Sequence, residues 1–199
     1  MALGDYAKVN YENYILICVG GRLNERKYLR MLDISILLNR TFQCFQNVYS
    51  IASFIGPQYS GNVYFTKHGS SLTVTGYLSG FPRNKWLGVH IHEYGALGNE
   101  CNDAGPHFNP FNSDHGGLTG SPRHPGDFGN HYVDQNGILT LDFNVDISSI
   151  TKFNGFLGRA LVIHEKEDDL GRMDDDGSRK TGNSGKRLTC AVVGVWKAP

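Results

Sequence analysis

From about residue 47 onward, hydrophobic and polar residues alternate with the two-residue period of β-strands. Asn62–Thr66 and Ser71–Leu78 show this alternation on either side of Lys67-His68-Gly69, a sequence typical of a hairpin turn. Leu87–His92 has the composition of the next strand. These segments predict neighbouring antiparallel strands.

The second half of the chain repeats this arrangement. Asn130–Val133 and Ile138–Phe143 flank a second turn sequence, Asp134-Gln135-Asn136-Gly137. Arg159–His164 and Thr189–Val195 are rich in Val, Leu and Ile, as expected of buried strands. Strands this short, joined by such turns, predict an all-β antiparallel sandwich or barrel.

Two long segments interrupt the strands. Glu93–Gly129 and Glu165–Arg187 are rich in Gly, Asp and Asn and show no helical period. Loops of this length are uncommon inside a compact domain and usually carry function. We therefore expect the functional residues in these two loops or at the strand ends beside them.

The first 46 residues differ from the rest. They contain only short apolar runs, Tyr14–Val19 and Ile34–Leu38, which are shorter than the core of a secretory signal. Asn39-Arg40-Thr41 matches the N-glycosylation pattern, which matters only in a secreted chain. We expect residues 1–46 to be an N-terminal extension, either a leader or disordered, and residues 47–199 to form the domain.

Composition narrows the class of protein. The chain of 199 residues is 40% hydrophobic and contains 25 glycines, which suits a turn-rich β domain with a core. Its 19 basic and 19 acidic residues cancel, and no basic stripe indicates a nucleic-acid partner. No apolar run reaches about 18 residues, so no membrane span is expected. The cysteines form no Cys-x-x-Cys pair, so a thiolate zinc site is not expected.

The histidines are concentrated in one part of the sequence. Six of the eight lie between positions 90 and 164 and belong to one candidate set. Core packing does not explain this concentration, because histidine is the side chain that proteins use for metal binding and proton transfer near neutral pH. With one nearby aspartate they form a candidate two-metal site: His90, His92, His107, His115, His124, Asp127 and His164.

Spacing divides this set into two groups. His90 and His92 are two residues apart in a predicted strand, so both imidazoles project from the same face. His164 ends another predicted strand and can supply a third nitrogen, and imidazoles without a thiolate suit copper or zinc. The other two histidines, His68 in a predicted turn and His131 at a strand start, are expected to be ordinary hydrogen-bonded residues.

The second group comes from the first long loop. His107, His115, His124 and Asp127 supply three nitrogens and one carboxylate oxygen, the composition of a tetrahedral structural zinc site. Such a site would also hold in place a loop that has little core of its own. Spacing alone does not assign the two metals.

Six segments around these ligands carry a family resemblance. They are Gly88–Gly95, Ala104–Pro110, His115–Gly117, Arg123–Asp127, Leu161–Lys166 and Lys180–Cys190. Together they resemble the copper/zinc superoxide dismutase family over about residues 47–197. The resemblance implies an all-β Greek-key β-sandwich, or flattened eight-stranded barrel, with two long functional loops.

The resemblance also implies, position by position, how the ligands divide. Copper would be held by His90, His92, His107 and His164, and zinc by His107, His115, His124 and Asp127. His107 would therefore bridge the two ions through both ring nitrogens.

Four further residues have implied roles. Asp168 matches a carboxylate that links ligands of the two metals, in line with the general rule that ligating imidazoles are oriented by an outer partner. Cys101 and Cys190 match a disulfide within the chain. Arg187 matches an arginine that, with His107, acts on the substrate, because an always-charged guanidinium can attract and orient a small anion.

The implied activity is superoxide dismutation by one-electron cycling of copper beside a structural zinc, with oxygen and hydrogen peroxide as products. The alternative is a copper-delivery or metal-binding protein with a dismutase-like domain, which should carry a paired-cysteine copper motif; Cys18 and Cys44 are isolated. Asp174, Asp175 and Asp176 lie in the second long loop, and the sequence leaves open whether they weaken anion attraction.

Partners and compartment follow from the same resemblance. The substrate would be the small anion superoxide, the assembly a homodimer, and a copper chaperone a further partner. Leu157-Gly158 and Val193-Gly194-Val195 match apolar contact positions of the family. No nucleic acid or membrane partner is expected. We expect a cytoplasmic protein, or an extracellular one if the N-terminal region contains a signal.

Overall fold

The computed structural model describes residues 18–19, 22–23, 49–120, 122–150 and 155–197. The chain divides into two units, Met1–Val48 and Tyr49–Pro199. In the first unit the described part is a pair of two-residue strands, β1 (Cys18–Val19) and β2 (Arg22–Leu23). The boundary expected after residue 46 and the glycosylation pattern at residues 39–41 lie outside the described residues, and both stay predictions.

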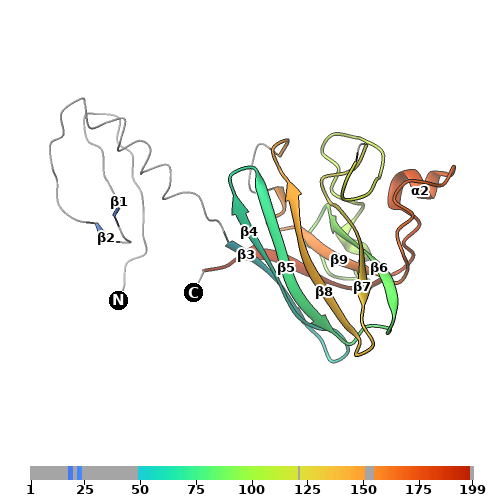
Figure 1. Ribbon diagram of the computed structural model, residues 1–199, viewed down its shortest axis with the longest axis horizontal. Coiled ribbons are helices and arrows are strands. Elements are labelled where there is room, and N and C mark those ends of the chain that lie inside the picture. The colour runs from blue at the N-terminus through green and yellow to red at the C-terminus, as the bar shows by residue number, and fades with distance from the viewer. Residues whose placement is uncertain (1–17, 20–21, 24–48, 121, 151–154, 198–199) are drawn as a thin grey trace. The chain divides into compact units, whose positions relative to one another are not determined.

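The second unit is a closed eight-stranded antiparallel barrel, which confirms the expected fold class (Figure 1). Its strands are β3 (Tyr49–Ile55), β4 (Ser60–His68), β5 (Ser71–Ser79), β6 (Lys85–His92), β7 (Asp127–Val133), β8 (Ile138–Asp146), β9 (Ala160–His164) and β10 (Arg187–Val195). Around the barrel they follow the order β10-β3-β4-β5-β8-β7-β6-β9. Because β5 pairs with β8 and β6 with β9, connections cross between non-sequential strands, which is the Greek-key arrangement.

Strand β3 is the one barrel strand that the sequence pattern did not predict. Its buried positions are Ser50, Ala52 and Phe54, whereas Ile55 is 93% exposed. Small and polar residues therefore point into the barrel and a large aliphatic residue points out. This inversion removes the alternation of hydrophobicity on which the prediction of the other strands rested.

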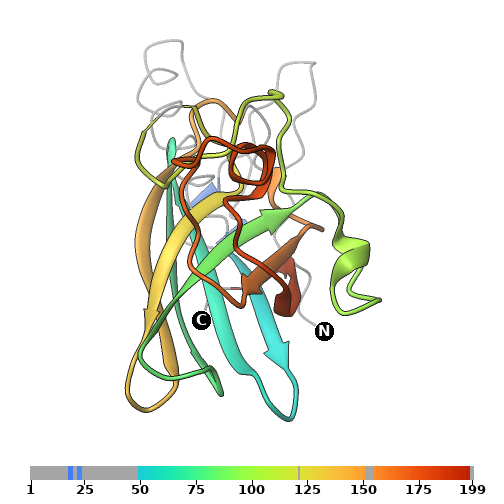
Figure 2. The ribbon, with the colours of Figure 1, turned by 90° about the vertical axis from the view of Figure 1, so that its right-hand side faces the viewer.

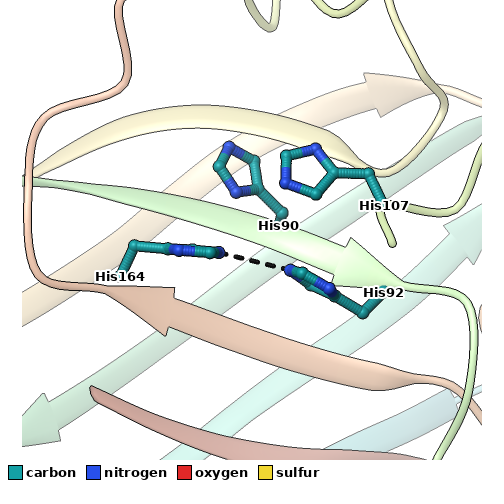
Figure 3. A group of neighbouring side chains, drawn as sticks. All are labelled: His90, His92, His107 and His164. Atoms are coloured by element: carbon teal, nitrogen blue, oxygen red, sulfur yellow. Dashed lines mark hydrogen bonds between the residues drawn. The ribbon is translucent and has the colours of Figure 1, made fainter. Parts of the chain in front are cut away.

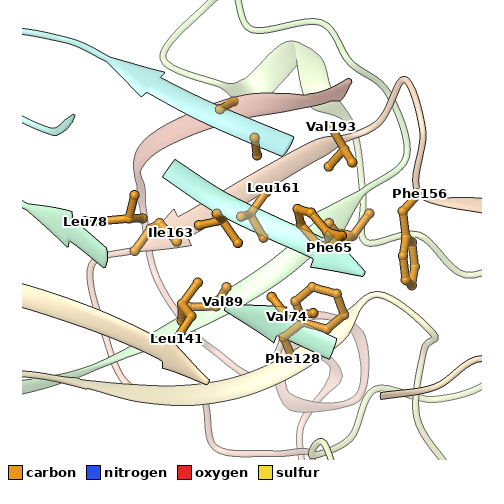
Figure 4. Close-up of a cluster of buried hydrophobic side chains, with 14 of the residues drawn as sticks. Phe65, Val74, Leu78, Val89, Phe128, Leu141, Phe156, Leu161, Ile163 and Val193 are labelled. Atoms are coloured by element: carbon orange, nitrogen blue, oxygen red, sulfur yellow. The ribbon is translucent and has the colours of Figure 1, made fainter. Parts of the chain in front are cut away.

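The interior of the barrel is filled by the inward-facing side chains of its strands (Figure 4). In β5, for example, Leu72, Val74 and Leu78 are buried at two- and four-residue intervals, as the period of a strand requires. From other strands come further buried members of the same cluster, including Phe65, Val89, Phe128, Leu141, Leu161, Ile163 and Val193. Val193, proposed from sequence as a contact position, thus belongs to the core.

Strands β6 and β9 differ from the other strands in being buried on both faces. The loop that follows β9 covers the outer face of β6, and Figure 2 shows it, in red, in front of the barrel. Its Lys166 carbonyl accepts a hydrogen bond of 2.9 Å from the Gly88 amide. A Cβ atom at Gly88 would lie 2.8 Å from the Ser184 hydroxyl, so only glycine lets the loop approach this closely.

This second long loop contains a helix that the sequence analysis did not expect. Helix α2 (Asp176–Thr181) is capped at its start by Asp175, whose side chain accepts a 2.8 Å hydrogen bond from the Ser178 amide. It ends at Gly182 in the left-handed conformation. Six residues are too short to show a helical period, so the two capping residues were the only signal. The first loop contains a short 3₁₀ turn, η2 (Asn102–Ala104). None of the described helices is both long and apolar enough to cross a membrane.

Replacing Leu141 by alanine should destabilise the barrel without touching the outer face of β6. Leu141 is 1% exposed in the core, and truncation of such a residue typically costs about 2–5 kcal/mol of the free energy of unfolding. Urea unfolding monitored by circular dichroism measures the change. The exposed neighbour Thr140→Ala is the control and should stay within about 0.5 kcal/mol of the parent. Equal effects of the two changes would contradict the assignment of Leu141 to the core.

Candidate metal centre

Strand β6 places two histidines on the outer face of the barrel. Val89 and Ile91 point inward as part of the core, so the alternating His90 and His92 point outward. Both imidazoles are nevertheless buried, with exposed fractions of 0% and 1%. The loops that cover this face shield them from water, as the sequence analysis expected of functional residues beside long loops.

His164 reaches the same face from strand β9. Leu161 and Ile163 belong to the core, which directs the side chain of His164 outward. The two strands are antiparallel neighbours, and Nε2 of His164 lies 3.2 Å from Nε2 of His92 (Figure 3). The third histidine expected beside His90 and His92 is therefore in place.

The first long loop folds back over β6 and delivers His107. His107 forms an isolated β-bridge with His92, and the Phe108 amide donates a 2.8 Å hydrogen bond to the Ile91 carbonyl. The imidazoles of His90 and His107 lie with their centroids 4.0 Å apart (Figure 3). Four histidines from three segments of the chain thus converge on one point.

The disulfide implied for this loop is present. Cys101 in the loop is joined to Cys190 in β10, across 89 residues of sequence. Chain-entropy models assign about 4–5 kcal/mol to closing a loop of this length. The bond fixes the segment immediately before His107 to the barrel wall.

A second cluster forms around Asp127 at the start of β7. One of its carboxylate oxygens, Oδ1, lies 3.0 Å from Nδ1 of His107, 3.0 Å from Nδ1 of His115 and 3.1 Å from Nδ1 of His124. The other oxygen, Oδ2, accepts hydrogen bonds from the amides of Gly116 and His124, at 3.1 and 2.7 Å. The backbone bonds fix the carboxylate, and three ring nitrogens meet its free oxygen.

Hydrogen bonds decide which nitrogen of each imidazole carries its proton. Nδ1 of His92 donates to the Gly105 carbonyl at 2.8 Å, and Nδ1 of His164 donates to the Gly185 carbonyl at 3.2 Å. A neutral imidazole has one donor and one acceptor nitrogen, so the two Nε2 atoms that face each other both carry lone pairs. Two lone pairs 3.2 Å apart repel each other unless a proton or a metal ion lies between them.

The same reasoning applies to His124 and His115. Nε2 of His124 donates to the Ser113 carbonyl at 3.1 Å, and Nε2 of His115 donates to Asp168 at 2.8 Å. Their Nδ1 lone pairs therefore point at the carboxylate of Asp127, where they repel it unless a cation intervenes. The carbonyls of Gly105, Gly185 and Ser113 were not found from the sequence, because a backbone acceptor leaves no residue-type signal.

Asp168 joins the two clusters. Its Oδ2 accepts from Nε2 of His90 at 2.9 Å, and its Oδ1 accepts from Nε2 of His115 at 2.8 Å. The Asn130 side chain holds the Asp168 backbone through two hydrogen bonds of 2.7 Å. Asp168 thus leaves Nδ1 of His90 as a free, buried acceptor and orients one ligand in each cluster.

Burial keeps most of these imidazoles neutral. It lowers the pKa of His90 and His92 well below the usual value, assisted by the neighbouring His107, and lowers the pKa of His164 to about 3. For His115, burial works in the same direction, but the carboxylates of Asp127 and Asp168 outweigh it and raise the pKa to about 9, so in the absence of a metal a proton is the cation between Nδ1 and Asp127. Neutral imidazole is the form that binds metals, and the carboxylates that favour a charged His115 would also favour a bound dication.

The geometry brings together all seven residues expected from the sequence. The structure groups His90, His92, His107 and His164 as one set of converging ligand atoms, and His90, His107, His115 and Asp127 as another. His124 is outside the second set, although its Nδ1 lies 3.1 Å from Oδ1 of Asp127. His90 and His107 both belong to the two sets. Nε2 of His90 donates to Asp168, whereas Nε2 of His107 is buried without a hydrogen-bond partner among the described residues and its Nδ1 faces Asp127. An imidazole with both nitrogens directed at separate clusters fits a bridging ligand.

A cavity of about 350 Å³ reaches the first cluster from the surface, and its lining includes His92, His107, His164 and Arg187. Arg187 is held by backbone carbonyls of the disulfide-linked loop, with hydrogen bonds of 2.6 Å to Cys101 and 2.6 Å to Gly105. The expected arginine therefore lies in the wall of the channel that leads to the histidines.

The three consecutive acids of the second loop are engaged elsewhere. Asp174 and Asp176 pair with Arg179 at 3.0 and 2.9 Å, and Asp175 caps helix α2. None of them is among the described residues that line the channel. The sequence left their effect on anion attraction open. In the structure, Asp174 and Asp176 form ion pairs with Arg179, and Asp175 accepts the capping hydrogen bond of helix α2.

Chain comparison settles the family. The family description "Copper/zinc superoxide dismutase (SODC)" matches residues 59–193. The chain belongs to the copper/zinc superoxide dismutase family. It is therefore an oxidoreductase that converts superoxide to oxygen and hydrogen peroxide, with copper and zinc as its cofactors.

Several proteins are similar to this dismutase. "Extracellular superoxide dismutase [Cu-Zn]" of Schistosoma mansoni is 55% identical over 75% of this chain and 81% of its own. "Extracellular superoxide dismutase [Cu-Zn]" of Drosophila melanogaster is 40% identical over 74% of this chain and 86% of its own. A solved structure, the crystal structure of the clock protein EA4, superposes with a TM-score of 0.70 at 38% identity, covering 76% of this chain and 96% of the other.

The two histidines outside the metal set have ordinary surroundings in this dismutase. His68 is exposed at the turn between β4 and β5. His131 packs its ring against Phe143 at a centroid distance of 4.7 Å, and its Nε2 donates to the Phe128 carbonyl at 3.1 Å. Burial lowers the pKa of His131 to about 4.

Replacing His131 by glutamine should make folding less sensitive to acid. The folded-state pKa of about 4 lies below the ordinary value of about 6.5, so the unfolded chain binds more protons between these values. The parent should therefore lose about 1–3 kcal/mol of its free energy of unfolding as the pH falls through this window, beyond any loss that it shares with His131→Gln.

Denaturant unfolding of both proteins at several pH values between about 7 and 4 measures the difference. Glutamine keeps an amide N–H that can donate to the Phe128 carbonyl. Loss of metal at low pH destabilises both proteins equally, so it cancels when the two free energies of unfolding are subtracted. His68→Gln, at an exposed position, serves as the control and should follow the parent. Parallel curves for the parent and His131→Gln would show that His131 does not carry this pH dependence.

Proposed function

We propose that the two clusters divide the metals of this dismutase between them. Copper is held by His90, His92, His107 and His164, and zinc by His107, His115, His124 and Asp127. The observation that supports this assignment is the direction of the unprotonated nitrogens: each group of lone pairs converges on one point, and only His107 has a nitrogen in each group.

His124 rather than His90 completes the zinc group. The Nε2 atom of His90 donates to Asp168, so this imidazole has one free nitrogen, and that nitrogen is needed beside His92 and His164. His124 has its Nδ1 turned to the same oxygen of Asp127 that faces His107 and His115. Three nitrogens and one carboxylate oxygen form a closed set of the kind that holds structural zinc.

When bound, copper supplies the one-electron chemistry that both half-reactions need, and zinc supplies a fixed charge without redox activity. Arg187 attracts the anionic substrate and orients it. His107 is the proton-handling group, because its Nε2 is buried at the end of the channel and is free of hydrogen bonds within the described residues. A proton held at this atom can be transferred to the reduced oxygen species, which takes a second proton from solvent in the channel and leaves as hydrogen peroxide.

The decay rate of superoxide in the presence of purified protein tests this function. Protein loaded with both metals should accelerate the decay by several orders of magnitude, whereas metal-free protein should not. His92→Ala should remove copper binding and activity while zinc is retained. His124→Ala removes one of four zinc ligands and should chiefly lower zinc affinity, by more than the about 10–100-fold that loss of an outer partner costs, as measured in competition with a chelator. If fully loaded protein does not accelerate the decay, the alternative of a copper-delivery protein would be favoured instead. No feature of the described residues supports that alternative.

We further propose that the dismutase is a homodimer. Val192, on the outer face of β10, is 37% exposed, and Val195, the last residue of that strand, is 79% exposed. Val192 lies beside Gly95 and Gly158, where a Cβ atom on Gly95 would approach the Gly158 carbonyl to 2.3 Å. Small residues and exposed valines give a flat apolar patch of the type that pairs with a second copy. A copper chaperone as a partner stays a prediction.

Placing lysines at Val192 and Val195 should separate the dimer. Burying two lysine charges from each copy in the interface costs a large desolvation free energy. The double variant should therefore sediment as a monomer at micromolar concentration, while the parent sediments as a dimer. Tyr77→Lys on β5, at a position that is 72% exposed and far around the barrel from β10, is the control and should remain dimeric. A parent that sediments as a monomer would refute the proposal.

We propose an extracellular location, in place of the cytoplasm that the sequence alone favoured. Two relatives at 55% and 40% identity are named extracellular. A disulfide persists most readily outside the reducing cytosol. Expression of the full chain in cultured animal cells should therefore place the enzyme in the medium. Retention of the folded protein in the cytosol would support the original expectation instead.

A further inference from the structure

A second cavity lies beside the zinc-side cluster. It has a volume of about 520 Å³, within the range of about 300–1,000 Å³ that is usual for sites of small molecules. No described residue lines both this cavity and the channel that leads to the copper-side histidines. A ligand in this cavity would therefore not occupy the path of the substrate.

Both long loops form walls of the cavity, and both are attached to His115. One wall is the glycine-rich segment 115–118, and the other consists of residues 170–172 together with Arg179. The His115 amide donates a 2.8 Å hydrogen bond to the Arg179 carbonyl. Gly171 packs so closely on the His115 carbonyl that a Cβ atom on this glycine would lie 2.4 Å from the oxygen. A ligand that contacts both walls would therefore hold the two loops together around a zinc-side histidine.

One arginine of the cavity has no partner among the described residues. The side chain of Arg172 is exposed and forms neither an ion pair nor a hydrogen bond with them. Arg179, in contrast, is paired with Asp174 and Asp176. The two arginines outnumber the one acid of the described lining, Asp114. A free guanidinium can bind a carboxylate through two parallel hydrogen bonds, so the cavity offers a site for an anionic group.

Backbone amides of the glycine-rich wall add further donors. Gly117 and Leu118 line the cavity, and their N–H groups have no acceptor among the described residues. Gly129 also lines the cavity, and a Cβ atom on this glycine would lie 3.6 Å from the Leu118 nitrogen. Because Gly129 has no side chain, the Leu118 nitrogen is left open on that side. Free N–H groups in such segments are a common means of binding anions.

The rest of the lining includes apolar side chains. Phe128 and Leu118 belong to the barrel core or pack against it, and Leu170 faces the cavity from the second loop. Sites for small molecules usually combine an apolar lining with a few polar groups that fix the orientation of the ligand. This combination suits an organic anion better than a fully hydrated inorganic ion.

We propose that this cavity binds a small organic carboxylate, and that its occupation slows the loss of zinc from the neighbouring cluster. The carboxylate pairs with Arg172 and with the amides of Gly117 and Leu118, while the apolar part lies against Leu170. The effect on zinc rests on the proposed function, because it takes His115 as a zinc ligand. Zinc and the carboxylate favour the same arrangement of the two loops, so each raises the affinity of the protein for the other by the same factor.

NMR titration with 4-fluorobenzoate tests the site. The full chain carries both metals, with copper reduced to diamagnetic Cu(I) so that amide resonances near the metals stay visible. The dissociation constant should be about 1 mM, as expected for a ligand of about ten non-hydrogen atoms. The largest changes in amide chemical shift should fall at Gly117, Leu118 and Arg172. Changes confined to the surroundings of Arg187, or no changes at about ten times this concentration, would overturn the proposal.

Variants of the two unpaired charges locate the carboxylate. Arg172→Gln should weaken binding by about 2–5-fold, as expected for an exposed ion pair, and Arg172→Lys should recover part of the loss. Asp114→Asn should strengthen binding by about 2-fold. Arg83→Gln is the matched control, because it removes the same charge from an exposed arginine between β5 and β6, outside the described lining. Equal affinities of Arg172→Gln and Arg83→Gln would show that the probe binds elsewhere.

Transfer of zinc to 4-(2-pyridylazo)resorcinol, a coloured chelator without carboxylates, measures the coupling. At four times its dissociation constant, 4-fluorobenzoate should slow zinc loss from the parent by up to about 5-fold, and by less in Arg172→Gln. Sodium chloride at the same concentration, the control for ionic strength, should leave the rate unchanged. An unchanged rate with bound probe would refute the coupling. If the loaded parent fails to accelerate superoxide decay, the proposed function fails instead, and the titration still decides whether the cavity binds a carboxylate.

Discussion

The structure depends on one electrostatic constraint: buried ring nitrogens and a carboxylate are directed at each other and need cations between them. On the outer face of β6 and β9, Nε2 of His92 faces Nε2 of His164, and around Asp127 three Nδ1 atoms face one oxygen. Such an arrangement is unfavourable in a low-dielectric interior unless cations fill it. Metal binding is therefore part of what makes the fold favourable, and not an addition to a finished barrel.

The barrel and the loops have separate tasks in meeting this constraint. Inward-facing residues such as Val89 and Ile163 form a core that would exist without metals, and they turn His90, His92 and His164 outward as a consequence of strand alternation. The loops then bring the remaining ligands and exclude water. The Cys101–Cys190 disulfide, Asp168 and the close contact at Gly88 hold them against the barrel.

The same loops determine how charge is presented to solvent. The acids at positions 174–176 cap α2 or bind Arg179, and they are not among the described residues of the channel wall. The charge of the channel wall comes instead from a few side chains. Among them, Arg187 is fixed by hydrogen bonds to backbone carbonyls, and Lys186 is exposed. Arg187 is thus held at a fixed place in the wall of the cavity that leads to the histidines.

Much of this could be predicted from the sequence, because period and residue type are local properties. Alternation predicted seven of the barrel strands, and the concentration of histidines together with the matching segments predicted every member of the metal set, the disulfide and Arg187. Tertiary structure decided what depends on atoms distant in sequence. Strand β3 buries the small residues Ser50 and Ala52, which its own sequence pattern does not indicate. The proton positions of His92 and His164 depend on the carbonyls of Gly105 and Gly185. The surroundings of Arg187 and Asp174 depend on which cavity or partner each side chain reaches. A sequence specifies which chemical groups are available. The burial, the hydrogen bonds and the electrostatic field of each group depend on where the folded chain places it.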